Sequence, residues 1–134
     1  MGMYTGMKVQ AVIKNEYVDA MKKVLEDHDF VHLLPVIPQD QVLTLKSYMS
    51  LSRHDHVFSL VGSGKFDGYE TGEYWNLEEE GGSRMDGNVL YAFASLKNYD
   101  DVIEQFVQTI LPIIASNIVL AESWYEESSK PRKI

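Results

Sequence analysis

The sequence predicts an α+β domain in which helices pack on one face of an antiparallel sheet. The first observation behind this prediction is the stretch Asn88–Leu96, which is apolar at nearly every position. A strand with one face in solvent should alternate between apolar and polar residues. This stretch does not alternate, so we expect a central strand that is covered on both faces.

Two further observations support the same fold class. Residues 16–27 and 97–116 carry apolar side chains at helical spacing. Both segments follow a strand-like run that ends in Lys-Asn, Ala11–Asn15 (AVIKN) in one case and Ala94–Asn98 (ASLKN) in the other. Two strand-helix units, with more strands between and after them, predict a ferredoxin-like split βαβ fold with an elaborated middle.

The N-terminal elements follow from local patterns. Residues 7–14 alternate between apolar and other side chains, which predicts a strand. Asn15 suits the N-cap of the helix that follows it. Pro35 and Pro38 then interrupt regular structure, so residues 27–38 are interpreted as a helical turn followed by a buried connection.

The middle of the chain is less regular. Residues 40–51 have apolar positions at helical spacing but several Ser and Thr residues, so a helix is preferred and a strand is the alternative. Residues 56–61 read as a strand, and residues 62–72 read as a Gly-rich loop. Residues 73–79 are expected to form a hairpin with the central strand, because Asp86-Gly87 is a turn signal.

In the C-terminal part, Asp101 and Glu104 fit the two ends of a capping box at the start of the last helix. Pro112 should disturb the helix near residues 109–111, because it lacks an N–H and crowds the preceding turn. A final strand is expected over residues 118–125. The sequence thus predicts one α+β domain over residues 1–127 and a frayed polar tail over residues 128–134.

Composition excludes several classes of function. The chain has no cysteine, which removes disulfides and thiol chemistry. It has neither a signal-peptide pattern at its N-terminus nor an apolar run long enough to span a membrane, so a cytoplasmic location without membrane association is expected.

The charge of the chain is uneven. Residues 1–65 hold 7 acidic and 7 basic side chains, whereas residues 66–134 hold 13 acidic and 5 basic side chains and so carry the net charge of −8. This acidity disfavours direct binding to nucleic acid and favours a protein partner or self-association.

His54 and His56 are the weak metal-binding candidates. If residues 54–56 were extended, both imidazoles would lie on one face and could share a metal ion. A third ligand has no recognisable position in the sequence. Gly62-Ser63-Gly64-Lys65 lacks the spacing of a phosphate-binding loop. No catalytic residue and no cofactor is therefore predicted, and an enzyme is the less favoured class.

Four aromatic residues are the candidate partner-binding residues: Tyr74, Trp75, Trp124 and Tyr125. They occur as adjacent pairs on predicted strands in the acidic half of the chain. Adjacent strand residues point to opposite faces, so one member of each pair can pack inside while the other stays exposed. Aromatic side chains are enriched where proteins bind one another.

Three short segments carry a resemblance: Tyr4–Gly6, Ser95–Tyr99 and Glu122–Glu127 (ESWYEE). They resemble a group of small proteins of Gram-positive bacteria and their phages, and the resemblance implies a possible phage or mobile-element setting without any activity. The leading hypothesis is a non-enzymatic protein-binding or regulatory module. The alternatives are a small metal- or ligand-dependent enzyme that uses the His54/His56 region, and a phage-encoded acidic inhibitor of a basic host protein.

Overall fold

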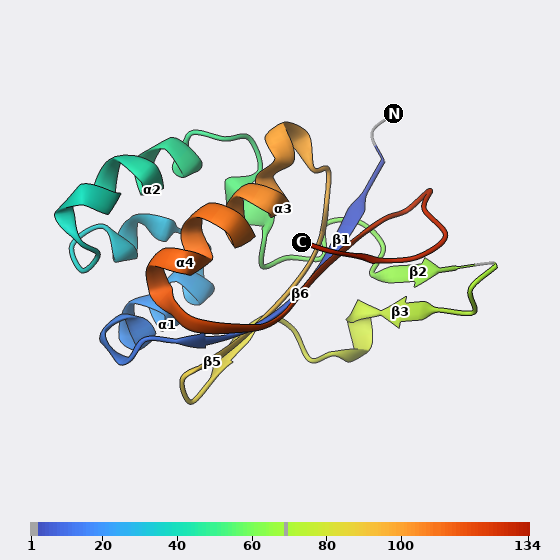
Figure 1. Ribbon diagram of the computed structural model, residues 1–134, viewed down its shortest axis with the longest axis horizontal. Helices are drawn as coiled ribbons and strands as arrows, with labels where there is room; N and C mark the ends of the chain where they lie inside the picture. The colour runs from blue at the N-terminus through green and yellow to red at the C-terminus, as the bar shows by residue number, and fades with distance from the viewer. Residues whose placement is uncertain (1–2, 69) are drawn as a thin grey trace.

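A five-stranded antiparallel sheet forms the centre of the protein, with helices on one side and a short two-stranded hairpin on the other (Figure 1). The computed structural model describes residues 3–68 and 70–134. Residues 1–2 and 69, which belong to the predicted domain and the predicted loop, lie outside the described residues. The strand order is β4-β5-β1-β6-β7, formed by Arg84–Asp86, Val89–Leu96, Thr5–Ile13, Ala115–Tyr125 and Arg132–Lys133. The predicted α+β class is confirmed.

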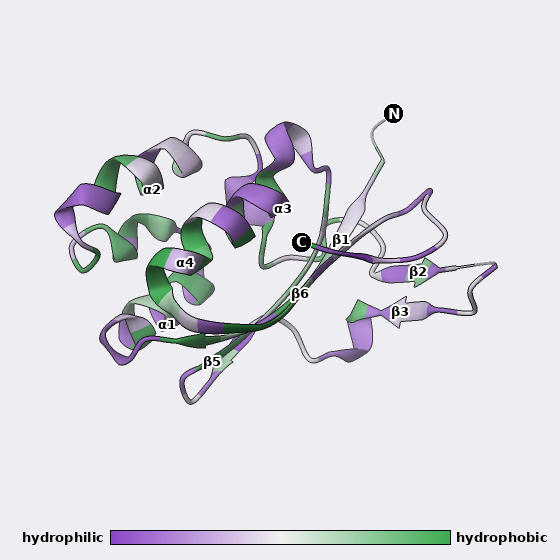
Figure 2. Ribbon diagram, viewed as in Figure 1, coloured by the Kyte–Doolittle hydropathy of each residue, from purple (hydrophilic) through white to green (hydrophobic). Residues whose placement is uncertain are grey.

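The helical layer consists of α1 (Val18–Asp27), α2 (Val42–Met49) and a C-terminal helix that contains α3 (Val102–Gln105) and α4 (Leu111–Ile114). The helix expected over residues 16–27 is confirmed, although it begins through a 3₁₀ turn in which Asn15 makes no side-chain cap. Residues 40–51 also form a helix rather than the alternative strand. Figure 2 shows hydrophobic residues along α4 and the adjoining strands.

The helix-side core follows from the alternation along the strands. Met7, Val9, Ala11 and Ile13 of β1 are all buried against the helices. Between the helices lies an aromatic cluster of Phe30, Tyr48, Phe58 and Phe106. The rings of Phe30 and Phe106 each lie 5.3–6.4 Å, between centroids, from the other three rings. This cluster connects α2, the C-terminal helix and the two connecting segments that carry Phe30 and Phe58.

The C-terminal helix departs from regular α geometry where Pro112 predicts a disturbance. Residues Phe106–Ile110 form a π-helical turn between α3 and α4. Proline at position 112 has no N–H to donate to the carbonyl four residues earlier, and the wider turn accommodates this loss. Asp101 takes the predicted N-cap position of α3, but its side chain makes no capping hydrogen bond. Asn98 replaces it: its Oδ1 accepts from the Ile103 N–H at 2.8 Å, and its Nδ2 donates to Glu104 Oε1 at 2.7 Å.

A second, smaller core covers the opposite side of the sheet. It contains Phe66, Trp75, Leu77, Phe93 and Trp124. Strand β5 is therefore covered on both faces, as predicted. The sheet offers little space there, since a Cβ at Gly6 would lie 2.6 Å from the Phe66 ring.

The predicted pairing of residues 73–79 with the central strand is wrong. Strand β3 (Tyr74–Asn76) instead pairs with β2 (Lys65–Asp67), and these strands form the hairpin on the far side of the sheet. β5 pairs with β4 through the turn at Gly87-Asn88. Gly81 and Gly82 have φ values of +89° and +82°, so the chain can leave the far-side core and return to the sheet edge.

Two other predictions for the middle of the chain fail. Residues 56–61 are not a strand: His54–His56 form a 3₁₀ turn after Arg53, whose φ is +65°. Only Leu60 makes a bridge, to Ser95. Val57 and Phe58 are buried without strand pairing, so their apolar character reflects packing. The predicted loop over residues 62–72 contains β2.

The C-terminal residues differ from the frayed tail that the sequence predicts. Arg132 pairs with Ser123 and Lys133 pairs with Glu122, which places β7 at the sheet edge. The Ile134 N–H donates to the Ala121 carbonyl at 3.0 Å, and the Ile134 side chain packs against the helix-side core. These backbone bonds and this apolar contact order the polar segment.

Tyr48 gives a prediction for alkaline pH. Burial raises the pKa of its phenol above the ordinary value of 10.0, and the Asp55 charge adds to this effect. Above pH 10 the Tyr48 phenol therefore stays protonated in the folded state but loses its proton in the unfolded state. The contribution of Tyr48 to the free energy of unfolding is fully present below pH 10 and is lost as the pH rises above 10, by up to about 1.4 kcal/mol per pH unit.

Denaturation in urea between pH 8 and pH 11 measures this loss. Tyr48→Phe should lose less stability over that range than the wild type. Tyr125→Phe, at an exposed tyrosine, is the matched control and should follow the wild type. Parallel pH dependence of Tyr48→Phe and the wild type would contradict the assignment.

Candidate binding groove

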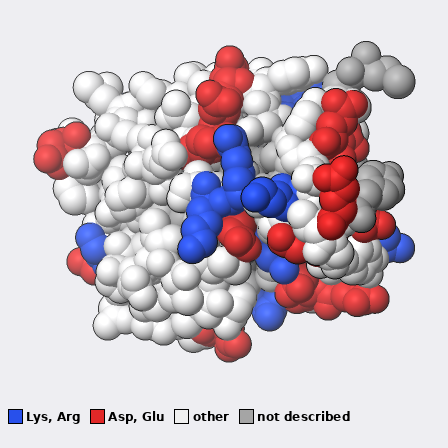
Figure 3. Space-filling model, turned by 45° about the vertical axis from the view of Figure 1, so that its right-hand side comes forward, with Lys and Arg blue, Asp and Glu red and all other residues white. Residues whose placement is uncertain are grey.

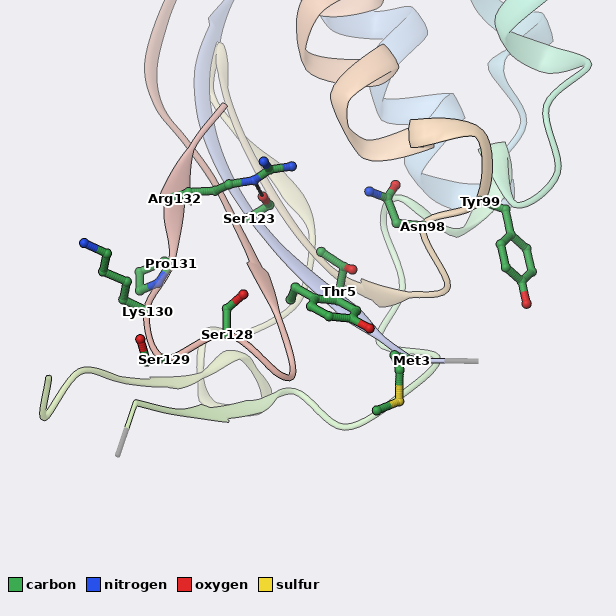
Figure 4. A pocket seen from close by; sticks show the side chains of 11 residues that line it. Met3, Thr5, Asn98, Tyr99, Ser123, Ser128, Ser129, Lys130, Pro131 and Arg132 are labelled. Atoms are coloured by element: carbon green, nitrogen blue, oxygen red, sulfur yellow. Dashed lines mark hydrogen bonds between the residues drawn. The ribbon is translucent and has the colours of Figure 1, made fainter. Parts of the chain in front are cut away.

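An open groove of about 1010 Å³ lies at one end of the sheet (Figure 4). Its walls come from Met3 and from Thr5 at the start of β1, from Asn98 and Tyr99 before α3, from Ser123 and Tyr125 at the end of β6, and from residues 128–132. We call this cavity the C-terminal groove. It brings together segments that are far apart in the sequence.

The groove exists because the helical layer is shorter than the sheet. Met7 and the later inward-facing residues of β1 belong to the helix-side core, but Thr5 does not and lines the groove instead. Strand pairing places Thr5 opposite Tyr125 and Met7 opposite Ser123, so these β6 side chains also face the helix side. Polar residues therefore replace apolar ones where the helices end.

A hydrogen-bonded network fixes one wall of the groove. The Arg132 Nη2 group donates to Glu104 Oε2 at 2.9 Å, and Arg132 Nε donates to Ser123 Oγ at 3.5 Å. Glu104 also accepts from Asn98, so both of its carboxylate oxygens are occupied. The Glu104 side chain is only 16% exposed, whereas that of Arg132 is 74% exposed. The network thus holds the guanidinium group at the groove with much of its surface open to solvent.

The groove differs in charge from its surroundings. Its charged lining residues are Lys130 and Arg132, and its other lining side chains are neutral. The chain as a whole has a net charge of −8. Figure 3 shows several basic side chains side by side near the middle of the view, with acidic side chains beside them and further acidic side chains toward the right. The groove lining therefore contains no acidic side chain, and the charge of one of its two basic residues, Arg132, is paired with that of Glu104.

The four predicted partner-binding residues fall into two groups. Trp75 and Trp124 are buried, and their ring centroids lie 5.4 Å apart in the far-side core. Tyr74 and Tyr125 are exposed, but on different parts of the molecule: Tyr74 lies on the hairpin and Tyr125 lines the groove. The two tryptophans thus contact each other, whereas the two tyrosines lie on different parts of the surface. A role in partner binding stays a prediction for all four.

His54 and His56 do not share a strand face, because they lie in a 3₁₀ turn. His54 Nδ1 is hydrogen-bonded to the Leu51 carbonyl at 2.9 Å, and His56 Nε2 lies 3.8 Å from Asp55 Oδ1. Within residues 3–68 and 70–134, no three His, Cys, Asp or Glu side chains are grouped so that they could hold a metal ion. Neither histidine lines the C-terminal groove.

Sequence reasoning missed most of the groove. The alternation of β1 and β6 could have pointed to Thr5 and Ser123, because both are polar residues at positions that face the helix side of the sheet. The part played by residues 128–132 was hidden, because their polar composition is typical of a loose tail.

Across the described ranges, no helix combines the length and the apolar character needed to cross a membrane. Comparisons with protein-family models, with curated proteins and with solved structures found no match to this chain.

Proposed function

We propose that this protein is a non-enzymatic binding module that docks a short segment of a partner protein in the C-terminal groove. The observation that carries the proposal is the groove itself, an open cavity of about 1010 Å³. Sites for small ligands are typically enclosed and of roughly 300–1,000 Å³. An open groove of this volume suits several residues of a peptide better than one buried small molecule.

The lining chemistry supports a protein partner. It includes two tyrosines, three serines, an asparagine and an arginine. Tyrosine and arginine are enriched at the centres of protein interfaces, and serine and asparagine supply adaptable hydrogen bonds. Tyr125, one of the predicted contact residues, is 43% exposed in the groove.

A metal- or ligand-dependent enzyme is the weaker candidate. Proton transfer and nucleophilic catalysis need a base that is within hydrogen-bond reach of the reacting group. The groove lining contains hydroxyl, amide and cationic groups but no His, Cys, Asp or Glu. His54 and His56 lie elsewhere, so binding is favoured over chemistry.

One observation favours a second candidate, the acidic inhibitor of a basic protein. Tyr74 is 57% exposed on the β2–β3 hairpin, where it pairs with Asp67 and follows Glu73. Such a surface would bind a basic partner with a strong dependence on salt.

A cytoplasmic location, self-association, a phage setting and the lack of direct nucleic-acid binding also stay proposals from the sequence.

The strand order supports the finer fold assignment. In chain order β1, α1, β4, β5, the C-terminal helix and β6 make two β-α-β units, and β1 lies between β5 and β6. This is the order expected of a ferredoxin-like split βαβ fold, with α2 and the hairpin inserted after α1. Because one fold can serve many functions, this assignment adds nothing to the choice of ligand.

Selection from a random peptide library tests the proposed function. The purified chain is the bait, and Ser128→Trp is a second bait in which a large side chain should fill the groove, since Figure 4 shows Ser128 directed into it. We expect peptides that bind the wild type and lose at least about tenfold in affinity with Ser128→Trp, equivalent to about 1.4 kcal/mol.

The matched control is Ser47→Trp, which makes the same change at an exposed position of α2. This variant should retain wild-type affinity. If no peptide is selected, or if the selected peptides bind all three proteins equally, docking in the groove is contradicted.

A further inference from the structure

We propose that residues 115–120 of β6 pair with the same strand of a second copy of this chain, so that the two sheets join into one. We call these residues the open edge of β6. Within residues 3–68 and 70–134, the open edge pairs with β1 on one side, whereas β7 pairs only with Glu122 and Ser123 on the other. The Ile134 N–H extends this cover no further than the Ala121 carbonyl. The inference does not depend on docking in the C-terminal groove.

The backbone of the open edge can accept another strand. A strand directs N–H and C=O groups to both of its sides, and β1 uses those on one side. At a sheet edge the groups on the other side form a template for an added chain. An extended segment that binds there gains main-chain hydrogen bonds. The open edge is therefore a surface for strand pairing.

The two edges of the sheet differ in their protection. Natural proteins protect an exposed edge by keeping it short and by placing charged residues or proline on it. Strand β4, at the opposite edge, has only three residues, and two of them, Arg84 and Asp86, are charged. The open edge contains neither a charged residue nor a proline. Ile118 is 37% exposed and Val119 is 53% exposed, so apolar side chains lie where protecting charges are expected.

Charge favours a second copy at this edge. Each chain has a net charge of −8, so two copies repel each other over most of their surfaces. Residues 105–121 are the longest stretch of the sequence without a charged side chain. Within this stretch, the four consecutive residues Ser116–Val119 are exposed. Contact through the open edge therefore brings two copies together where their side chains do not repel each other.

The shape of β6 also favours an identical strand as its partner. The register of β6 against β1 shifts at two positions, between Gln10 and Ala11 and between Val12 and Ile13. Such irregularities bend a strand and increase its twist, and Figure 1 shows β6 curving as it leaves α4. A straight partner would separate from this bend. An antiparallel copy related by a two-fold axis bends in the same sense and presents the same residues.

Sedimentation velocity of the full chain tests whether it forms this dimer. Pairing of a short edge buries less surface than a standard interface, so we expect a dissociation constant of about 1–100 µM. Val119→Lys places like charges on both copies and should raise this constant at least about tenfold. Leu43→Lys is the matched control, because Leu43 lies on α2 and is 78% exposed. It should leave the dissociation constant unchanged.

Amide hydrogen exchange of the wild type locates the contact. In the dimer, the outward-pointing amides of the open edge should exchange at least about tenfold more slowly than in the monomer. The amides of β4 are the internal control and should exchange equally in both states. A chain that stays monomeric up to about 1 mM would overturn the proposal, even if an added peptide protected the open edge. Equal effects of the two lysine variants, or a dimer without protection in residues 115–120, would also overturn it.

Discussion

Replacing Trp124 with alanine should lower the free energy of unfolding by about 3–5 kcal/mol. Trp124 is 1% exposed, and its ring lies 5.4 Å from Trp75 and 6.0 Å from Phe66 between centroids. Its Nε1 group also donates to the Ser128 carbonyl at 2.8 Å. The substitution therefore leaves a cavity in the far-side core and releases the segment that forms one wall of the groove.

Urea denaturation followed by circular dichroism measures this loss. Trp124→Phe is the control, because it keeps an aromatic ring but removes the N–H donor, and it should cost less than Trp124→Ala. A loss of under about 1 kcal/mol for Trp124→Ala would contradict the packing described for the far side of the sheet.

Phe30→Ala should produce a loss of similar size, about 3–5 kcal/mol, from the opposite side of the sheet. Phe30 is fully buried, and its ring lies 5.3 Å from Tyr48, 5.6 Å from Phe58 and 6.1 Å from Phe106 between centroids. Removing it opens the centre of the aromatic cluster on which the helical layer depends. Natural domains are stabilised by about 5–15 kcal/mol in total, so this change is a large part of the whole.

The same urea denaturation experiment checks this prediction. Phe30→Leu keeps most of the apolar volume and should lose less stability than Phe30→Ala. Val31→Ala is a positional control, because Val31 is the next residue and is 42% exposed. If Val31→Ala and Phe30→Ala were equally destabilising, the cluster would not be the centre of the helix-side core.

The regular elements could be predicted from sequence because their burial follows a simple period. The apolar stripe of α1 and the apolar residues on both faces of β5 can each be read from one segment of the sequence alone. The strand partner of residues 74–76 could not be predicted, because the apolar pattern of a strand does not say which other strand it pairs with. Trp75 packs against Trp124 and Phe66 instead of joining the sheet beside β5, and these contacts join residues that are distant in the sequence.

The site was less predictable than the fold. The aromatic character of Tyr125 makes it a candidate, and strand alternation predicts that it and its neighbour Trp124 point to opposite faces, but nothing in the sequence separates Tyr125 from Tyr74. Arg132 was assigned to a loose tail, although its pairing with Ser123 and its contact with Glu104 place it in the groove. The contact between Arg132 and Glu104 joins residues 28 positions apart, and it forms only because β7 is paired with the sheet.

The most direct test of the groove as the contact surface compares the two exposed tyrosines. Isothermal titration calorimetry should measure the affinity of the strongest selected peptide for the wild type, Tyr125→Ala and Tyr74→Ala. Both variants remove an exposed tyrosine ring from a strand, but only Tyr125 lines the groove. We predict that Tyr125→Ala weakens binding at least about tenfold, as expected for a central aromatic contact, and that Tyr74→Ala changes it less than about twofold. The reverse result would place the contact surface on the acidic hairpin and contradict the proposed function of the groove.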